Sequence, residues 1–126
     1  MKYALLLYGD ESQWDGLDAE AQGEVMAQHG EATEAMQAAG AYVGGEALEL
    51  TNTARTVRVR DGKPLVTDGP FVEAKEALGG FYIVECASAE EAAEWAARLP
   101  EARTGGVEVR PLIDFAAMEG EAAAGA

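Results

Sequence analysis

The segment at 2–8, KYALLLY, most constrains the fold, because it is typical of a strand with apolar side chains on both faces. Successive side chains of a strand point to opposite faces. The two faces here carry Tyr3, Leu5 and Leu7 on one side and Ala4, Leu6 and Tyr8 on the other. A second segment of this kind follows at 81–86, FYIVEC. Such strands are typical of the centre of a sheet that is covered on both sides.

Only two amphipathic helices are predicted to cover that sheet. The first runs over about 19–39, with Asp18 as its N-cap and Gly40 as its stop. The second opens with a capping box at 88–91, SAEE, and ends at Pro100. Two helices can cover one face of such a sheet, so the other face needs a different cover.

The remaining segments complete an alternation of strands and helices. AYVGGEALEL at 41–50 predicts a strand interrupted by glycines, and a last strand is expected at 107–113. Alternating residues on both sides of Asp61-Gly62 predict a β-hairpin over 56–67. The predicted class is therefore α+β, a ferredoxin-like split βαβ sheet with an inserted β-hairpin. A second copy of the chain is the simplest cover for the bare face, so we expect a homodimer.

Length and composition exclude several classes of protein. The 126 residues predict one domain at 1–115 and a flexible acidic and alanine-rich tail at 116–126. A formal net charge of −14 repels nucleic acid and anionic membranes, so neither is an expected partner. One cysteine and one histidine disfavour a disulfide or a structural metal site, and we expect no metal and no cofactor. The apolar run at the N-terminus is too short for a signal peptide or a membrane span, which favours a cytoplasmic location.

Candidate site residues gather in one segment, LVTDGPFVEAKEALGGFYIVE, at 65–85. Gly69 precedes a proline and Pro70 lacks an amide hydrogen, so a stiff corner fixes the direction of Asp68. Asp68 is then either an acid–base group or the acceptor of an Asx turn. The residues that follow have two interpretations each. Phe71 is a plug in the core or a platform for a ligand, and Glu73, Lys75 and Glu76 are ligand contacts or a solvated helical turn.

His29 is the second candidate for acid–base chemistry, because its unperturbed pKa suits proton transfer near neutral pH. It lies on the inward stripe of the first helix, four residues after Val25. Two interpretations remain open, a buried hydrogen-bonded residue or a partner of Asp68 across a cleft. Tyr8, at the end of the first strand, either packs in the core or presents its hydroxyl to the same cleft.

These motifs resemble the YCII-related domain proteins, in the subgroup marked by an Asp-Gly-Pro-Phe motif. The resemblance covers residues 1–115 and rests on YGD at 8–10, GGE at 44–46, VRVRDGKPLVTDGPFVEAKEALGGFYIVE at 57–85 and EEAAEWAARLP at 90–100. It implies a dimeric α+β barrel. It also implies an acid–base pair of a histidine and an aspartate facing a cleft, and the aspartate of the motif corresponds to Asp68. Some members of the subgroup occur beside alternative sigma factors.

Two functions are compatible with these patterns. The first is a small dimeric protein with a small-molecule cleft near the Asp-Gly-Pro-Phe loop. It would use Asp68, with or without His29, for acid–base chemistry, with Tyr8, Phe71, Glu73 and Lys75 contacting the ligand. The second is a non-catalytic ligand-sensing or regulatory module that acts with a protein partner such as a sigma factor. The sequence contains no phosphate loop, no nucleotide-binding fingerprint and no serine–histidine–acid order, so those enzyme classes are disfavoured.

Overall fold

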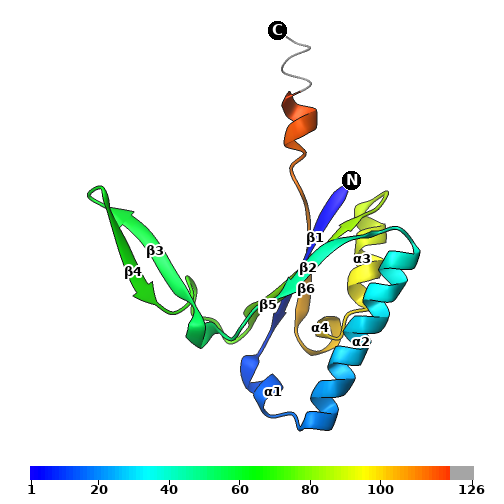
Figure 1. Ribbon diagram of the computed structural model, residues 1–126, viewed down its shortest axis with the longest axis horizontal. Coiled ribbons are helices and arrows are strands. Elements are labelled where there is room, and N and C mark those ends of the chain that lie inside the picture. Colours follow the sequence, from blue (N-terminus) through cyan, green and yellow to red (C-terminus); the bar gives the residue numbers. More distant parts are fainter. Residues whose placement is uncertain (120–126) are drawn as a thin grey trace.

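The computed structural model describes residues 1–119, which form a mixed α+β structure with an antiparallel sheet (Figure 1). Its four strands lie in the order β2-β5-β1-β6, and a separate pair of strands is formed by β3 and β4. The elements, in chain order, are β1 Lys2–Gly9, α1 Glu11–Asp15, α2 Ala19–Ala38, β2 Tyr42–Ala47, the short 3-10 helix η1 Thr51–Thr53, β3 Arg55–Arg60, β4 Lys63–Asp68, β5 Ala77–Glu85, α3 Ala89–Ala97, α4 Glu101–Thr104 and β6 Gly106–Pro111. Most of the predicted tail, at 120–126, lies outside the described residues.

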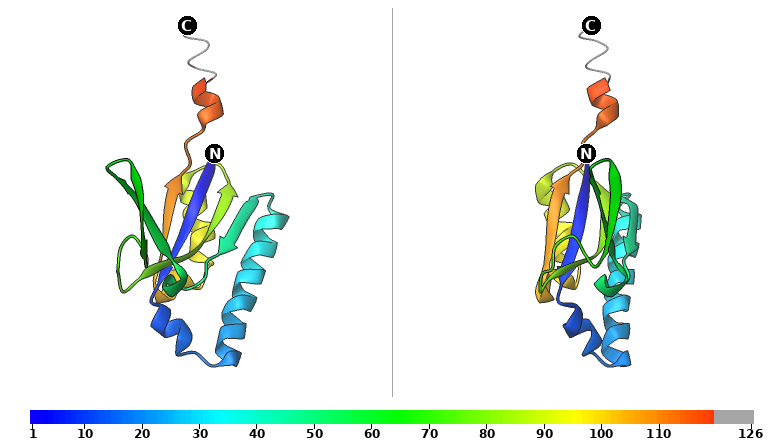
Figure 2. Two further views of the ribbon diagram at one scale, coloured as in Figure 1. Left: turned by 60° about the vertical axis from the view of Figure 1, so that its left-hand side comes forward. Right: turned by 90° about the vertical axis from the view of Figure 1, so that its left-hand side faces the viewer.

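The core lies between the sheet and the two longer helices, α2 and α3. Its largest fully buried side chains are Leu5, Met36, Val84 and Leu99. The helices lie on the same side of the sheet in Figures 1 and 2, so they cover the face that carries Leu5. This arrangement confirms the expectation that two helices cover one face only.

The other face of the sheet has no helix over it. It carries Leu6 of β1, which pairs with Phe81 of β5, and Ala4, which pairs with Ile83. Leu6, Phe81 and Ile83 are only half-buried. Strands β2 and β6 are the two edges, so residues 1–119 of a single chain do not close into a barrel.

The hairpin of β3 and β4 projects away from the rest of the molecule (Figures 1 and 2). We call residues 55–68 the arm and the rest of the described chain the body. The arm turns at Asp61 and Gly62, whose φ angles are 53° and 73°, as a type I′ turn requires. At its base the amide of Gly69 donates to the Ala54 carbonyl, at 2.8 Å. Every residue of β4 is exposed.

The helix signals in the sequence act much as predicted. The Asp18 carboxylate accepts a hydrogen bond from the Ala21 amide at 2.8 Å and so caps α2. Ser88 caps α3 by accepting from the Glu91 amide at 3.2 Å. The returning bond of the capping box is shifted by one residue, because the Glu91 carboxylate accepts from the Ala87 amide at 2.9 Å.

Several boundaries differ from the predictions. Helices α1 and α4 were missed, because segments of five and four residues are too short to show a helical period. Strand β5 begins at Ala77, four residues before the predicted strand at 81–86, and so includes Gly79 and Gly80. A Cβ at Gly80 would lie 2.9 Å from the Glu46 carbonyl oxygen, so glycine lets β2 and β5 approach closely there. Within residues 1–119, no helix combines the length and apolar character needed to cross a membrane.

Candidate functional site

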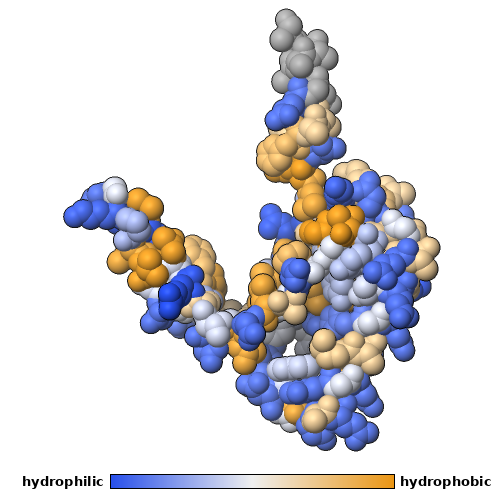
Figure 3. Space-filling view, viewed as in Figure 1, coloured by the Kyte–Doolittle hydropathy of each residue, from blue (hydrophilic) through white to orange (hydrophobic). Residues whose placement is uncertain are grey.

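A cavity of about 570 Å³ lies in the body, where β1 ends and α1 begins. Figure 3 shows the body hollowed in this region, at its lower end. The volume is in the range of small-molecule sites, and the wall is mainly apolar. The apolar lining includes Leu7, Trp14, Leu17, Met26, Leu48 and Leu50. The transfer of an apolar group from water into this cavity would therefore be favourable.

His29 lies in the wall of this cavity at the centre of a chain of hydrogen bonds. Its Nδ1 is 2.8 Å from the Tyr82 hydroxyl, and its Nε2 is 2.7 Å from Oε1 of Glu101. The imidazole also stacks on the Tyr82 ring, with 5.9 Å between the ring centroids. The side chains of His29 and Glu101 are 17% and 24% exposed, so the contact is largely shielded from bulk water. All three residues line the cavity.

Three separate elements position these side chains. α2 places His29 on its inward side, where Thr33, one turn later, donates to the His29 carbonyl at 2.8 Å. β5 places Tyr82 opposite the buried Leu5, on the face that the helices cover. α4 begins directly after Pro100, and its first residue is Glu101. The site thus depends on the packing of the body and not on any single motif.

The ionised Glu101 carboxylate can only accept, so it orients the hydrogen bonds of this chain when the His29 ring is neutral. Burial raises the pKa of the Tyr82 hydroxyl above its ordinary value of 10.0, and the nearby Glu101 carboxylate raises it further. Tyr82 is therefore protonated at neutral pH and can donate to Nδ1 of His29. The proton of the neutral imidazole then lies on Nε2 and is donated to Glu101. If the ring gains a second proton, the Tyr82 hydroxyl can rotate and accept from Nδ1.

Glu101 retains unused capacity. Its Oε2 is buried and has no hydrogen-bond partner among the described residues. Buried carboxylate oxygens are usually hydrogen-bonded, so this atom is an exception within the body. The other carboxylate oxygen of Glu101, Oε1, contacts Nε2 of His29. The negative charge of the carboxylate would stabilise a protonated imidazole ring there.

The predicted site residues divide between the body and the arm. Tyr8 and His29 line the same cavity. Asp68 ends β4 at the base of the arm and does not line it. The nitrogens of His29 bond to Tyr82 and Glu101, so the pairing of His29 with Asp68 is not made within this chain. Within residues 1–119 the Asp68 carboxylate accepts no hydrogen bond, so an Asx turn does not occupy it either.

Phe71 is not a plug in the core of this chain, and that interpretation is wrong for the single copy. Its side chain is 72% exposed, and the Arg58 guanidinium lies 4.9 Å from the centre of its ring. This contact is a cation–π interaction on the outside of the molecule. The helical turn considered for Glu73, Lys75 and Glu76 is also absent, since this part of the loop forms bends.

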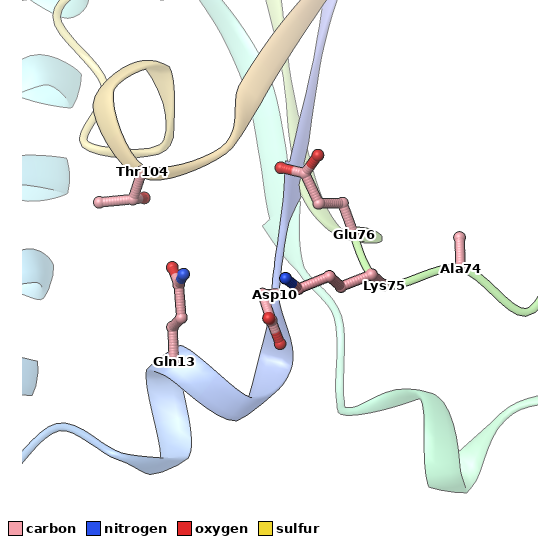
Figure 4. A pocket seen from close by; sticks show the side chains of 6 residues that line it. All are labelled: Asp10, Gln13, Ala74, Lys75, Glu76 and Thr104. Atoms are coloured by element: carbon pink, nitrogen blue, oxygen red, sulfur yellow. The ribbon is translucent and has the colours of Figure 1, made fainter.

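The loop nevertheless reaches a hollow beside the cavity (Figure 4). Lys75 extends from the loop toward Asp10, at the end of β1. Hydrogen bonds from the Ser12 hydroxyl and amide lower the pKa of Asp10, and the positive charge of Lys75 lowers it further. The hollow and the cavity share three lining residues, Asp10, Gln13 and Thr104, so the two adjoin.

Reasoning from the sequence missed Tyr82 and Glu101. Tyr82 lies within an apolar strand, where it is read as a core residue, and Glu101 follows a proline that ends a helix. They are 53 and 72 residues from His29, so no local spacing points to the contact. In the described part of the chain, no three histidine, cysteine, aspartate or glutamate side chains lie together as metal ligands would.

Comparison with known proteins identifies the family of this chain. The chain matches the YCII-related domain over residues 1–116. It is also similar to an uncharacterized protein of Rhizobium meliloti (strain 1021), with 40% identity over 114 residues, which are 89% of this chain and 92% of the relative. The match includes both the cavity and the arm, and the chain therefore belongs to the YCII-related domain family.

Proposed function

We propose that this protein binds a small molecule in the cavity of the body and transfers a proton through Tyr82, His29 and Glu101. The single observation that carries the proposal is the position of the only histidine, hydrogen-bonded at both nitrogens in a largely apolar cavity wall. Residues that combine shielding from water with a specific charge partner are typical of functional sites.

The geometry defines how a ligand would meet this chain of hydrogen bonds. Both nitrogens of His29 are already bonded, so a ligand approaches through the Tyr82 hydroxyl or the Glu101 carboxylate. Tyr82 is protonated at neutral pH and would act as the acid toward a ligand oxygen or nitrogen. This step requires the protonated ring of His29, whose charge the Glu101 carboxylate would stabilise. Its Nδ1 would donate to the Tyr82 oxygen and replace the proton given to the ligand, which leaves a neutral ring with its remaining proton on Nε2.

The working molecule is, on this proposal, a homodimer built on a ferredoxin-like sheet, of the subgroup marked by the Asp-Gly-Pro-Phe sequence at 68–71. The helix-free face with Leu6, Phe81 and Ile83 supports a dimer, because a second copy would remove this apolar surface from water. Asp68 would then contribute to a site from the other copy, since it does not reach the cavity of its own. A cytoplasmic location stays a prediction.

One experiment tests the binding part directly. His29 is the only histidine, so its ring gives one assignable pair of signals in a carbon–proton NMR spectrum. We expect some members of a library of small aromatic and amphipathic acids, alcohols and amines to shift these signals. The control is Leu65→Asp in the exposed arm, a replacement outside the lining of the cavity that should leave the spectrum of His29 unchanged. A library in which every compound leaves the ring signals in place would contradict the proposal.

A second step separates the enzyme from the alternative, a non-catalytic ligand-sensing or regulatory module. Each compound that binds is incubated with the protein and with the variants His29→Gln and Asp68→Asn. Conversion that His29→Gln abolishes while binding persists supports proton transfer. Binding without conversion supports the alternative, in which the exposed arm contacts a protein partner such as a sigma factor.

A further inference from the structure

The arm has two unlike faces. Residues that are directly opposed in an antiparallel pair point to the same side. Val57 opposes Val66 and Val59 opposes Pro64, so these four residues form one apolar surface, which we call the valine face. The opposite side carries three basic residues and one leucine. These are Arg58, Arg60, Lys63 and Leu65.

Nothing in the described part of the chain covers the valine face. Val57, Val59 and Val66 are all exposed. Figure 3 shows apolar surface on the arm and an open gap between the arm and the body. A two-stranded hairpin is marginally stable in water without a surface to pack on. The regular alternation of the arm therefore indicates that a further surface covers the valine face.

Charge indicates what this surface is. The arm has four basic residues and two acidic ones, so its net charge is +2. The net charge of the whole chain is −14, so the residues outside the arm carry a net charge of −16. A basic arm is attracted to an acidic molecule, and the body of this same protein is acidic. This attraction acts at a distance, because Arg58, Arg60 and Lys63 point away from the valine face. A second copy of the chain provides such an acidic body in any solution of the protein.

The helix-free face of the sheet has the matching pattern. Its centre is apolar, with Leu6 and Phe81 on the two inner strands. Charged residues flank this centre on the two edge strands. Two of them are acidic, and Arg110 of β6, which opposes Ala4, lies 3.6 Å from the Glu108 carboxylate. Glu108 of β6 opposes Leu6, and Glu46 of β2 opposes Phe81.

We propose that two copies exchange arms, so that the valine face of each arm packs on the helix-free sheet face of the other. The inference deepens the proposed dimer by assigning its interface. The exchange is symmetric, since each copy gives an arm and receives one. Arg55 and Asp68 oppose each other at the base of the arm, on the same side as the valines. Each arm therefore places its Asp68 at the edge of the other copy's sheet, and a site that uses Asp68 is incomplete in a single chain.

Neighbouring residues of β4 provide a matched test. Val66 is 55% exposed and Leu65 is 50% exposed, and they point to opposite sides of the arm. We expect Val66→Asp to raise the dimer dissociation constant by more than about tenfold, because each copy then places a charge against apolar surface. Leu65→Asp should leave the constant within about threefold of the unmodified protein. Sedimentation equilibrium gives the constants, and circular dichroism shows that both variants fold.

The possible outcomes separate this inference from the proposed dimer. An unmodified protein that is monomeric at 100 μM, roughly the top of a practical range, contradicts both. A dimer that Val66→Asp leaves intact, or that both variants weaken equally, overturns the exchange of arms alone.

A second measurement maps the surface that the arm meets. A photo-crosslinking residue at position 57, with one copy labelled with nitrogen-15, should join the arm to peptides of β1 or β5 from the other copy. Crosslinks to α2 or α3 would overturn the assignment of the sheet face.

Discussion

The body and the arm contain strands of similar regularity, but only the body has a core of its own. In the body, Leu5 and Val84 of neighbouring strands are fully buried beneath the helices. In the arm, all six residues of β4 are exposed, although apolar residues alternate along the hairpin. Alternation of apolar and polar residues therefore predicts that one face of a strand is buried. It does not predict which surface buries that face.

The residues proposed for acid–base chemistry are also divided between the body and the arm. The body holds the cavity with His29, Tyr82 and Glu101, and the base of the arm holds Asp68. A residue at the base of an exposed hairpin is poorly placed to act alone, because nothing excludes water from it. The following predictions either break this division or sharpen it.

Deleting side chains in the two regions should give the largest contrast. Leu5→Ala should lower the free energy of unfolding by about 2–5 kcal/mol, because it leaves a cavity in the core. Val59→Ala should change it by less than about 0.5 kcal/mol in the monomer. Urea denaturation at a dilution that keeps the protein monomeric measures both values. Equal losses would show that the arm is part of the same core.

Adjacent glycines of β2 test close packing within the body. A Cβ at Gly45 would lie 2.8 Å from the Phe81 carbonyl oxygen, whereas one at Gly44 meets no atom within 4 Å. Gly45→Ala should therefore destabilise the fold by about 1–3 kcal/mol, as overpacked sites do. Gly44→Ala is the control and should be close to neutral. A similar effect at both positions would mean that β2 and β5 are farther apart than described here.

Removing the imidazole tests whether the hydrogen bonds at the cavity also hold the body together. His29→Ala leaves Tyr82 and Glu101 without their shared partner and should cost about 1 kcal/mol. At a dilution that keeps the protein monomeric, the loss should be unchanged when Val66→Asp is added, because the body and the arm of one chain share no core. Thermal unfolding of the single and double variants shows whether the two effects add. A strong interaction between them would contradict the division.

The smallest effect concerns pH. The pKa of Tyr82 is raised in the folded state, chiefly by burial, so the unfolded chain releases this proton more readily. Folded stability should therefore fall as the pH rises through 10.0, the ordinary value for tyrosine. Tyr82→Phe should show a smaller fall over the same range, when unfolding is followed by urea titration at several pH values. An identical pH dependence would indicate that the hydroxyl of Tyr82 is not shielded from water.

Much of the body could be predicted from the sequence because its signals are local. Asp18 and Ser88 mark the starts of α2 and α3, and Asp61-Gly62 marks the turn of the arm. The short helices α1 and α4 carry no period, and they were missed.

The candidate site could be predicted only in part. A lone histidine on an inward stripe identified His29, and its two partners come from distant elements that meet only when the sheet and α4 pack together. Tyr8, for which both core packing and a place at the cleft were predicted as alternatives, lines this cavity from the end of a central strand. Asp68 was singled out by its stiff corner, but a corner in the sequence does not tell which surface it faces.

Hydrogen exchange measured over a range of protein concentrations tests the central claim most directly. If the arm has no cover in its own chain and is covered by a second copy, the amides of β3 and β4 should exchange slowly in concentrated protein and faster on dilution. The central amides of β1 and β5 should stay slow throughout, because the core of the body protects them. Exchange in the arm that does not depend on concentration would contradict the account.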